Sequence, residues 1–286
     1  MFLHTFYPSR IAFAFGAITI YWYGIFIIFG ILLGMAVILK ISNYYKIKKN
    51  LLLDLLFWLS ITSLFGARIY HILLEWTYYS KNLLDVFKIW HGGLAVHGAI
   101  FTGLVVIWIF AKKNKINFWL LTGIIAPGVA LAQAIGRWGN YFNQELFGKP
   151  TDLPWGIPID IINRPAEYLS SEFFHPTFLY ESIGNFLIFI ILIILHIYII
   201  KKHLVRWSPP PNRRGDSSET REKYYALCVM CYMFLYSALR FSLEFIRIDI
   251  TPVIFNLRFP QIISLLIILI SILFCANYFK TDIIDP

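Results

Sequence analysis

Polar side chains recur at helical spacing within two stretches of the chain that are otherwise apolar. In the first stretch, four such residues follow one another at intervals of four, three and four positions, and in the second the intervals are four, four and three. A helix places residues at these intervals on one face, so each stretch carries one polar stripe. The stripes are Gln133, Arg137, Asn140 and Gln144 in the first stretch, and Tyr236, Arg240, Glu244 and Arg247 in the second.

Two of these residues, Arg137 and Arg240, suit the binding of an anionic phosphate. A charged side chain at the centre of a membrane helix costs about 2.5 to 3.5 kcal/mol, so we expect it to serve binding or chemistry. A planar guanidinium group grips a phosphate with two hydrogen bonds. The alternative is that the charges pair with one another and only hold helices together. The i, i+4 spacing of Arg240 and Glu244 allows such a pair.

A histidine flanked by small residues is a candidate general base. His97 lies in the segment 92–99, which contains Gly92, Gly93, Ala95 and Gly98. Small residues let the backbone approach a ligand closely. Histidine titrates near physiological pH and is the commonest general base. The alternative for His97 is an ordinary hydrogen bond between helices.

The composition predicts an all-α integral membrane protein. Hydrophobic residues make up 58% and charged residues 14% of the chain, and the mean hydropathy is +0.66. Soluble proteins contain about 25% charged residues. A helix needs about 20 apolar residues to cross the hydrocarbon core of a bilayer. Seven such segments lie near residues 18–39, 52–74, 91–111, 118–137, 176–200, 224–246 and 260–279.

Lysine and arginine collect in the first, third and fifth connections between these segments. The positive-inside rule places those connections in the cytoplasm, with the amino terminus outside and the carboxyl terminus inside. The net charge of +9 then reflects topology and contact with anionic membrane lipids. No motif for nucleic acid accompanies it, so we expect no nucleic-acid partner.

Two connections are long. Residues 201–223 are rich in proline, serine and mixed charge, which predicts a flexible cytoplasmic loop. Residues 141–175 are richer in aromatic residues, and we expect an ordered cap between the fourth and fifth helices, with short strands around Trp155 to Ile162.

No metal or other cofactor is expected. Cys228 and Cys231 form a Cys-x-x-Cys pair inside a predicted span, without a partner histidine or cysteine nearby in the sequence. We interpret the cysteines as small packing residues. The chain also lacks a carboxylate cluster of the kind that holds Mg²⁺.

These residues resemble the prolipoprotein diacylglyceryl transferase family of bacterial inner-membrane enzymes. The resemblance covers nearly the whole chain and is most specific at residues 136–148, Gly-Arg-Trp-Gly-Asn-Tyr-Phe-Asn-Gln-Glu-Leu-Phe-Gly. The chain departs from the family pattern at Ala99, where a glycine is common, and at Ile248-Asp249-Ile250. The other matching fragments are Trp22-Tyr23-Gly24, Gly66-Ala67-Arg68, residues 92–98, His175-Pro176 with Leu179-Tyr180-Glu181, and Arg240 with Glu244-Phe245 and Arg247.

The resemblance implies an activity. The family moves the diacylglyceryl group of phosphatidylglycerol to the thiol of the lipobox cysteine in prolipoprotein signal peptides, forms a thioether and releases glycerol 1-phosphate. This is the first step of bacterial lipoprotein maturation. It also implies a multi-pass protein of the inner membrane with a periplasmic amino terminus and a periplasmic cap.

The resemblance also implies site residues. Independently of the resemblance, Tyr180 and Glu181 at the start of the fifth span are expected to lie inside the bundle, where they could orient an arginine. The expected catalytic residues are His97, Arg137 and Arg240, and the expected substrate-binding residues are Tyr23, Arg68, Asn140, Glu145, Gly148, Glu244 and Arg247.

Two other classes remain open from the sequence. A transporter or flippase would bind the same anionic headgroup, and Pro127 with Gly128 could break the fourth span as in such proteins. Transporters often show repeated halves, which this chain does not. A noncatalytic scaffold would explain the helices but not the polar stripes.

Overall fold

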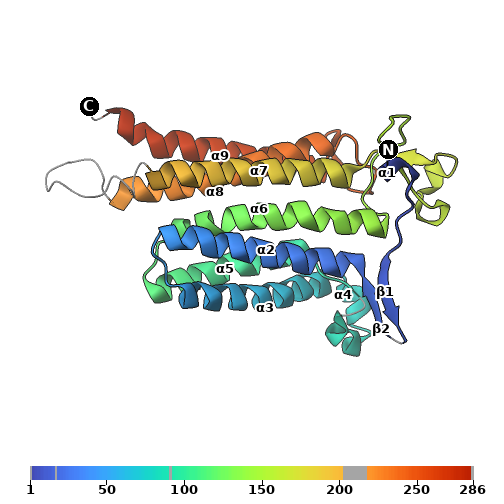
Figure 1. Ribbon diagram of the computed structural model, residues 1–286, viewed down its shortest axis with the longest axis horizontal. Helices are drawn as coiled ribbons and strands as arrows, with labels where there is room; N and C mark the ends of the chain where they lie inside the picture. The colour runs from blue at the N-terminus through green and yellow to red at the C-terminus, as the bar shows by residue number, and fades with distance from the viewer. Residues whose placement is uncertain (1, 17, 90–91, 202–217, 285–286) are drawn as a thin grey trace. The chain divides into compact units, whose positions relative to one another are not determined.

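The computed structural model describes residues 2–16, 18–89, 92–201 and 218–284. Within these residues, seven helices are long and apolar enough to cross a membrane, which confirms the predicted class of integral membrane protein. Residues 202–217 of the predicted loop 201–223 lie outside the described residues, and residues 218–223, which were predicted to belong to the loop, are helical. The seven helices are α2 (Trp22–Tyr44), α3 (Lys49–Leu74), α5 (Val96–Asn114), α6 (Phe118–Asn143), α7 (Thr177–Ile199), α8 (Ser218–Leu243) and α9 (Phe259–Ile284), as labelled in Figure 1.

Some helix ends differ from the prediction. Strand β2 (Ile18–Tyr21) occupies the start of the first predicted span and pairs with β1 (Ile11–Phe15) in an antiparallel hairpin. Isoleucine and threonine, which are β-branched, favour this extended conformation. The third span begins at Val96 rather than near residue 91, and the sixth ends at Leu243 rather than near residue 246.

The chain divides into two compact units. The first contains Met1–Ile38 and Gly123–Pro286, and the second contains Leu39–Thr122.

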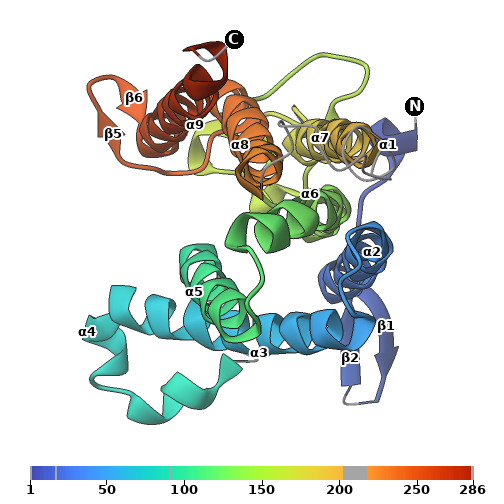
Figure 2. The same ribbon diagram turned by 90° about the vertical axis from the view of Figure 1, so that its left-hand side faces the viewer.

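In the first unit, α8 lies between α7 and α9 (Figure 2). Part of its apolar core consists of Ala126 and Ala130 from α6 with Ile188 and Leu192 from α7. Small residues in α6 allow a close approach to α2: a Cβ atom added to Gly34 would lie 2.7 Å from the carbonyl oxygen of Gly128. This backbone contact is typical of helix packing in membranes.

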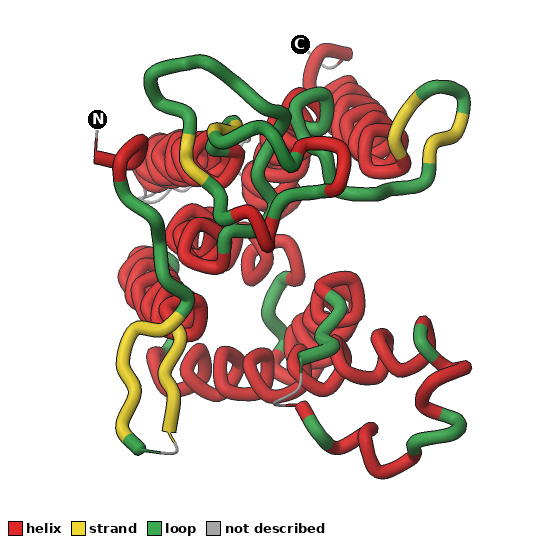
Figure 3. The backbone as a smooth tube through the Cα atoms, turned by 90° about the vertical axis from the view of Figure 1, so that its right-hand side faces the viewer, coloured by secondary structure: helices red, strands yellow, loops and turns green. Residues whose placement is uncertain are grey.

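An ordered cap follows α6. Strand β3 (Ile157–Pro158) lies in the range Trp155 to Ile162 where short strands were predicted, and its partner β4 (Phe173–Phe174) lies outside that range. The 3-10 helices η3 (Ile161–Asn163) and η4 (Ala166–Tyr168) lie between them. The loops of the cap cross over the ends of the helices in Figure 3. The apolar core beneath the cap contains Tyr141, Phe147, Ile157, Ile159, Phe174 and Phe178.

The amino-terminal segment is tied to this cap. The short helix α1 (Phe2–Thr5) places His4 against the cap, where its Nδ1 atom lies 2.9 Å from the Gly156 carbonyl oxygen and its ring stacks on Phe173. Tyr7 donates a hydrogen bond of 2.6 Å to Glu172. A further hairpin, β5 (Val253–Ile254) with β6 (Leu257–Arg258), joins α8 to α9.

In the second unit, α3 and α5 lie side by side (Figure 2). They meet at glycines: a Cβ atom on Gly98 would overlap the carbonyl of Gly66. The short helices α4 (Trp76–Tyr79) and η1 (Leu83–Phe87) follow α3 and lead back to α5.

The α2–α6 contact generates a stability prediction. Gly34→Ala should lower the thermal unfolding midpoint in detergent, because the added methyl group meets backbone that has no room to yield, at a cost of about 1 to 3 kcal/mol. Gly24→Ala on the same helix is the matched control, since no atom lies within 4 Å of an added Cβ there. Alanine favours a helix over glycine by up to about 1 kcal/mol, so the control should not be destabilised. Equal midpoints for both variants would contradict the packing.

Candidate functional site

The carboxylate of Glu181 lies at the centre of a polar cluster in the first unit. This residue belongs to the start of α7 and is 3% exposed. The Nε atom of Arg137, on α6, contacts its Oε2 atom. Nη1 of Arg247 lies 2.8 Å and Nη1 of Arg240 lies 3.5 Å from its Oε1 atom. A buried carboxylate is tolerated when it is paired, and three guanidinium groups pair with this one. The expectation that Glu181 orients an arginine is confirmed.

A second buried carboxylate extends the cluster. Nη2 of Arg240 lies 2.8 Å from Glu244, which is the i, i+4 pair that the sequence allows. Nε of Arg258 lies 3.1 Å from the same carboxylate. Asp249 lies 2.8 Å from Nε of Arg247. Although burial raises the pKa of Asp249, the hydrogen bond and charge of Arg247 hold it below its usual value. We call this set of four arginines and three carboxylates the arginine cluster.

Asn140 joins the arginine cluster to a further carboxylate. Its Oδ1 atom accepts a hydrogen bond of 3.3 Å from Nη1 of Arg137, and its Nδ2 atom donates one of 2.8 Å to Glu145. Asn143 also donates to Glu145, at 3.2 Å. With Glu145 included, positive and negative groups balance. An anionic ligand is therefore attracted by unused guanidinium donors rather than by an excess of charge.

Arg137 and Arg240 keep such donors. Among the described residues, Nη2 of Arg137 and Nε of Arg240 have no partner, and the two side chains are 23% and 19% exposed. Arg247 is 5% exposed. Arg258 uses all three nitrogens, on side chains of Thr251 and Glu244 and on backbone carbonyls. The geometry thus separates two arginines that can bind a ligand from two that brace the site.

Three members of the polar stripes lie beyond the ends of their helices. Glu244 directly follows α8, although its N–H still donates to the Arg240 carbonyl at 3.2 Å. Because α6 ends at Asn143 and Gln144 has a φ of 50°, the side chain of Gln144 turns toward the cap and donates to the Pro8 carbonyl at 2.9 Å. The prediction that Gln144 shares the helical face of Arg137 is wrong. Arg247 lies beyond the end of α8, so its helical placement is wrong too, although its side chain still reaches Glu181.

Gly148 lies at a close backbone crossing. Its N–H donates a hydrogen bond of 2.9 Å to the carbonyl of His175, and an added Cβ would lie 2.7 Å from a methyl group of Ile246. The contacts explain why this position needs glycine. A role for Gly148 in substrate binding stays a prediction.

Tyr23 and Tyr180 differ in their placement. Tyr23 packs over Gly139 of α6, where an added Cβ would lie 2.6 Å from its ring. Tyr180 is turned toward the cap, contrary to its expected place inside the bundle. Its hydroxyl accepts a hydrogen bond of 2.9 Å from Trp155 and lies 3.2 Å from Nδ1 of His175.

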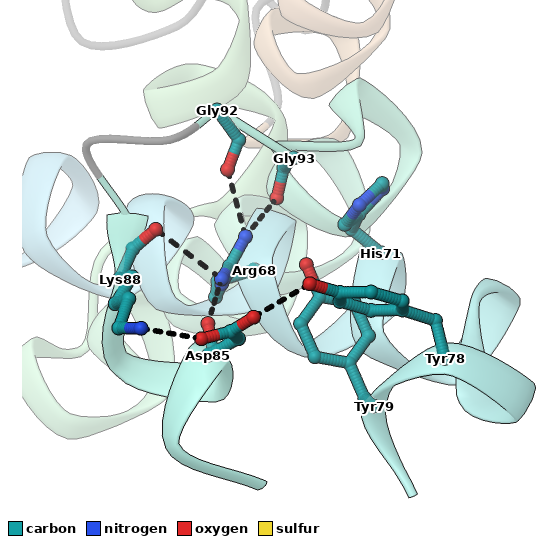
Figure 4. A pocket seen from close by; sticks show the side chains of 8 residues that line it. All are labelled: Arg68, His71, Tyr78, Tyr79, Asp85, Lys88, Gly92 and Gly93. Atoms are coloured by element: carbon teal, nitrogen blue, oxygen red, sulfur yellow. Dashed lines mark hydrogen bonds and ion pairs between the residues drawn. The ribbon is translucent and has the colours of Figure 1, made fainter. Parts of the chain in front are cut away.

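The second unit contains the remaining two predicted site residues, Arg68 and His97. Arg68 is buried and lines a pocket of about 200 Å³ (Figure 4). Its guanidinium group donates to backbone carbonyls of residues 85–93. All three nitrogen atoms of the Arg68 guanidinium group donate to these carbonyls. The contacts therefore give no support to the expected contact between Arg68 and the substrate.

His97 is the second residue of α5. Its ring centre lies 6.1 Å from that of Tyr70 on α3. No hydrogen bond of His97 is found among the described residues, and both its role as a base and the alternative of an interhelical hydrogen bond stay predictions.

Arg258 was missed by sequence reasoning. Arg258 is an isolated charged residue in an apolar region just before the last span, and this isolation could have marked it as a candidate site residue. Within the described residues, no group of three or more histidine, cysteine, aspartate or glutamate side chains could hold a metal ion.

A helical membrane bundle with buried, carboxylate-braced arginines defines a membrane protein whose site suits an anionic phosphate. The chain belongs to the prolipoprotein diacylglyceryl transferase family, whose model matches residues 10–277. It is 38% identical over 272 residues to the phosphatidylglycerol–prolipoprotein diacylglyceryl transferase of Finegoldia magna, covering 95% of this chain and 96% of that protein. It is 38% identical over 258 residues to the protein of that name from Synechococcus elongatus, covering 90% and 83%. The corresponding protein of a Nostoc species is 39% identical over 258 residues, covering 90% and 85%.

The central carboxylate generates a second stability prediction. Glu181→Gln should lower the unfolding midpoint strongly, because breaking a buried ion pair costs about 3 to 5 kcal/mol. The control is Glu172→Gln in the cap, an exposed carboxylate that pairs with Tyr7 and should contribute less than about 1 kcal/mol. Thermal unfolding in detergent measures both. Midpoints that shift by the same amount would show that Glu181 does not brace the cluster.

Proposed function

We propose that this chain transfers the diacylglyceryl group of phosphatidylglycerol to the lipobox cysteine of prolipoprotein signal peptides, the first step of lipoprotein maturation. Membership of the family and the names of the relatives support this activity. The structural observation that carries the proposal is that Arg137 and Arg240 share the Glu181 carboxylate and each keep an unused nitrogen. They can grip one phosphate from two sides.

The reaction is a displacement at carbon. The cysteine sulfur attacks the glycerol carbon that carries the phosphate ester, a carbon–sulfur bond forms and the carbon–oxygen bond breaks. The electron pair of that bond leaves with glycerol 1-phosphate. Negative charge therefore grows on the phosphate, where Arg137 and Arg240 stabilise it. Fixed cationic donors aimed at developing charge are an effective source of catalysis.

The attacking group must lose a proton. A free cysteine thiol has a pKa of about 8.5, so only a small part is thiolate at pH 7. His97 is the proposed base, which typically contributes about 10² to 10⁴ in rate. The alternative acceptor is the arginine-bound phosphate itself.

The other predicted residues shape the site. Asn140 and Glu145 orient Arg137 and the glycerol headgroup, and Tyr23 lies beside them on α2. Glu244 and Arg247 hold Arg240 and Glu181 in place. Gly148 lets the backbone of the cap approach the end of α8.

The proposed location is the bacterial inner membrane. The basic first, third and fifth connections favour a periplasmic amino terminus and cap. The substrates would then be phosphatidylglycerol of the outer leaflet and signal peptides whose lipobox cysteine reaches the same depth.

The direct test is incubation of the purified chain with phosphatidylglycerol and a lipobox peptide. The peptide mass should rise by one diacylglyceryl unit. A transporter or flippase would bind the lipid and leave the peptide mass unchanged, which would overturn the proposed transfer.

The arginine pair generates a prediction about turnover. Arg137→Lys and Arg240→Lys keep the charge but lose the two-pronged geometry, so each should lower the rate at least about tenfold while the protein still folds. Arg164→Lys is the control, because this arginine donates to the carbonyls of Ile159 and Leu169 within the cap. Wild-type rates in both cluster variants would rule out the phosphate clamp.

The proposed base generates a prediction about pH. His97→Asn keeps a hydrogen-bonding group but cannot titrate near neutrality. Turnover should fall by about 10² or more at pH 7. It should recover in part as pH rises toward the thiol pKa of about 8.5, because the substrate then ionises by itself. A pH–rate profile of both proteins on one peptide measures this. A mild defect independent of pH would assign the proton to the bound phosphate.

A further inference from the structure

Arg68 binds the backbone that leads into α5. Its Nε atom donates to the carbonyl of Val86 at 3.0 Å, and its Nη1 atom donates to Gly92 at 2.7 Å and to Gly93 at 3.1 Å. Nη2 donates to the carbonyls of Asp85 and Lys88. Figure 4 shows this guanidinium group among the carbonyls. One side chain therefore gathers five carbonyl groups from a segment without long helices.

The two residues before Arg68 hold the next part of the chain. The carbonyl of Ala67 accepts a hydrogen bond of 3.1 Å from the N–H of Ala95, the residue before α5. The carbonyl of Gly66 packs against Gly98 in the first turn of α5. Three consecutive residues of α3 thus fix the approach to α5 and its first turn, which includes His97.

We infer that Arg68 is a positioning residue, which fixes the start of α5 and through it the imidazole of His97. The inference rests on the proposed function of His97 as the base. It differs from the sequence expectation, in which Arg68 contacts the substrate.

The acceptors of Arg68 favour this role. All five are neutral backbone carbonyls. Among the described residues that line this pocket, the carboxylate is that of Asp85, which binds Lys88 at 2.6 Å and the hydroxyl of Tyr78 at 2.6 Å. A guanidinium group offers five N–H donors in a rigid plane, whereas lysine offers three on one atom. Only arginine can hold carbonyls spread over this distance along the chain.

Gly93 fits the same arrangement. Its φ is +77°, and a Cβ atom there would lie 2.6 Å from Nη1 of Arg68 and equally close to the ring of His71. Gly92 has a φ of +89°, but no atom lies within 4 Å of an added Cβ. Alanine is strained by backbone conformation at both positions, and only at Gly93 does it also displace the guanidinium group.

The first experiment compares Arg68→Lys with wild type by hydrogen–deuterium exchange of the full chain in detergent. Amides of residues 92–98 should exchange faster, because the carbonyls that hold this segment lose their donor, while those of α7 should not change. The pair Gly93→Ala and Gly92→Ala repeats the test without altering Arg68. Amides of residues 92–98 should exchange faster in Gly93→Ala than in Gly92→Ala.

The second experiment measures transfer from phosphatidylglycerol to a lipobox peptide. Arg68→Lys should lower kcat at least about tenfold and change KM for the lipid by less than about threefold, since no ligand contact is lost. The double variant Arg68→Lys/His97→Asn should have the same kcat as His97→Asn alone, because both substitutions impair the same proton transfer to His97.

The outcomes separate the inference from the proposed function. Unchanged exchange in Arg68→Lys, or a large rise in KM for the lipid, overturns the positioning role. Additive losses in the double variant also overturn it, because Arg68 would then act independently of His97. Full activity of His97→Asn overturns the proposed base instead, and with it the catalytic part of the inference, whatever the exchange shows.

Discussion

The pairing of one buried carboxylate with three arginines is the constraint on which the first unit depends. Glu181 extends from α7 to Arg137 on α6, to Arg240 on α8 and to Arg247 beyond α8. The two fully buried charges, Glu181 and Arg247, could not remain buried without their partners. The same contacts that hold the helices together also fix the direction of two guanidinium groups, so the structural role and the proposed binding role share one set of atoms.

The sequence predicted the class and the helices well, because apolar segments of about 20 residues have few other interpretations. The prediction was wrong where a local turn determines which way a side chain points or where a helix begins. Gln144 was expected on a helical face, but the helix ends one residue earlier and its positive φ redirects the side chain. The strand Ile18–Tyr21 was hidden for a similar reason, since a short apolar run suits a strand and a helix equally.

Within the site, spacing alone found the pair Arg240 and Glu244, because i, i+4 contacts are local. Contacts between distant segments were harder to predict. Arg258 reaches Glu244 from the far side of a hairpin, and nothing in its sequence neighbourhood indicates that partner. Arg68 shows the opposite difficulty: its charge suggested a ligand, whereas its acceptors are carbonyls of the chain itself.

The glycine contact between α2 and α6 has a consequence for lipid traffic. Where Gly34 meets the carbonyl of Gly128, and Gly30 meets that of Ala132, the two backbones touch. An acyl chain is several ångströms wide and cannot pass between helices in direct backbone contact. A lipid tail therefore cannot pass between α2 and α6 along this stretch, and any passage between these two helices would have to lie beyond it.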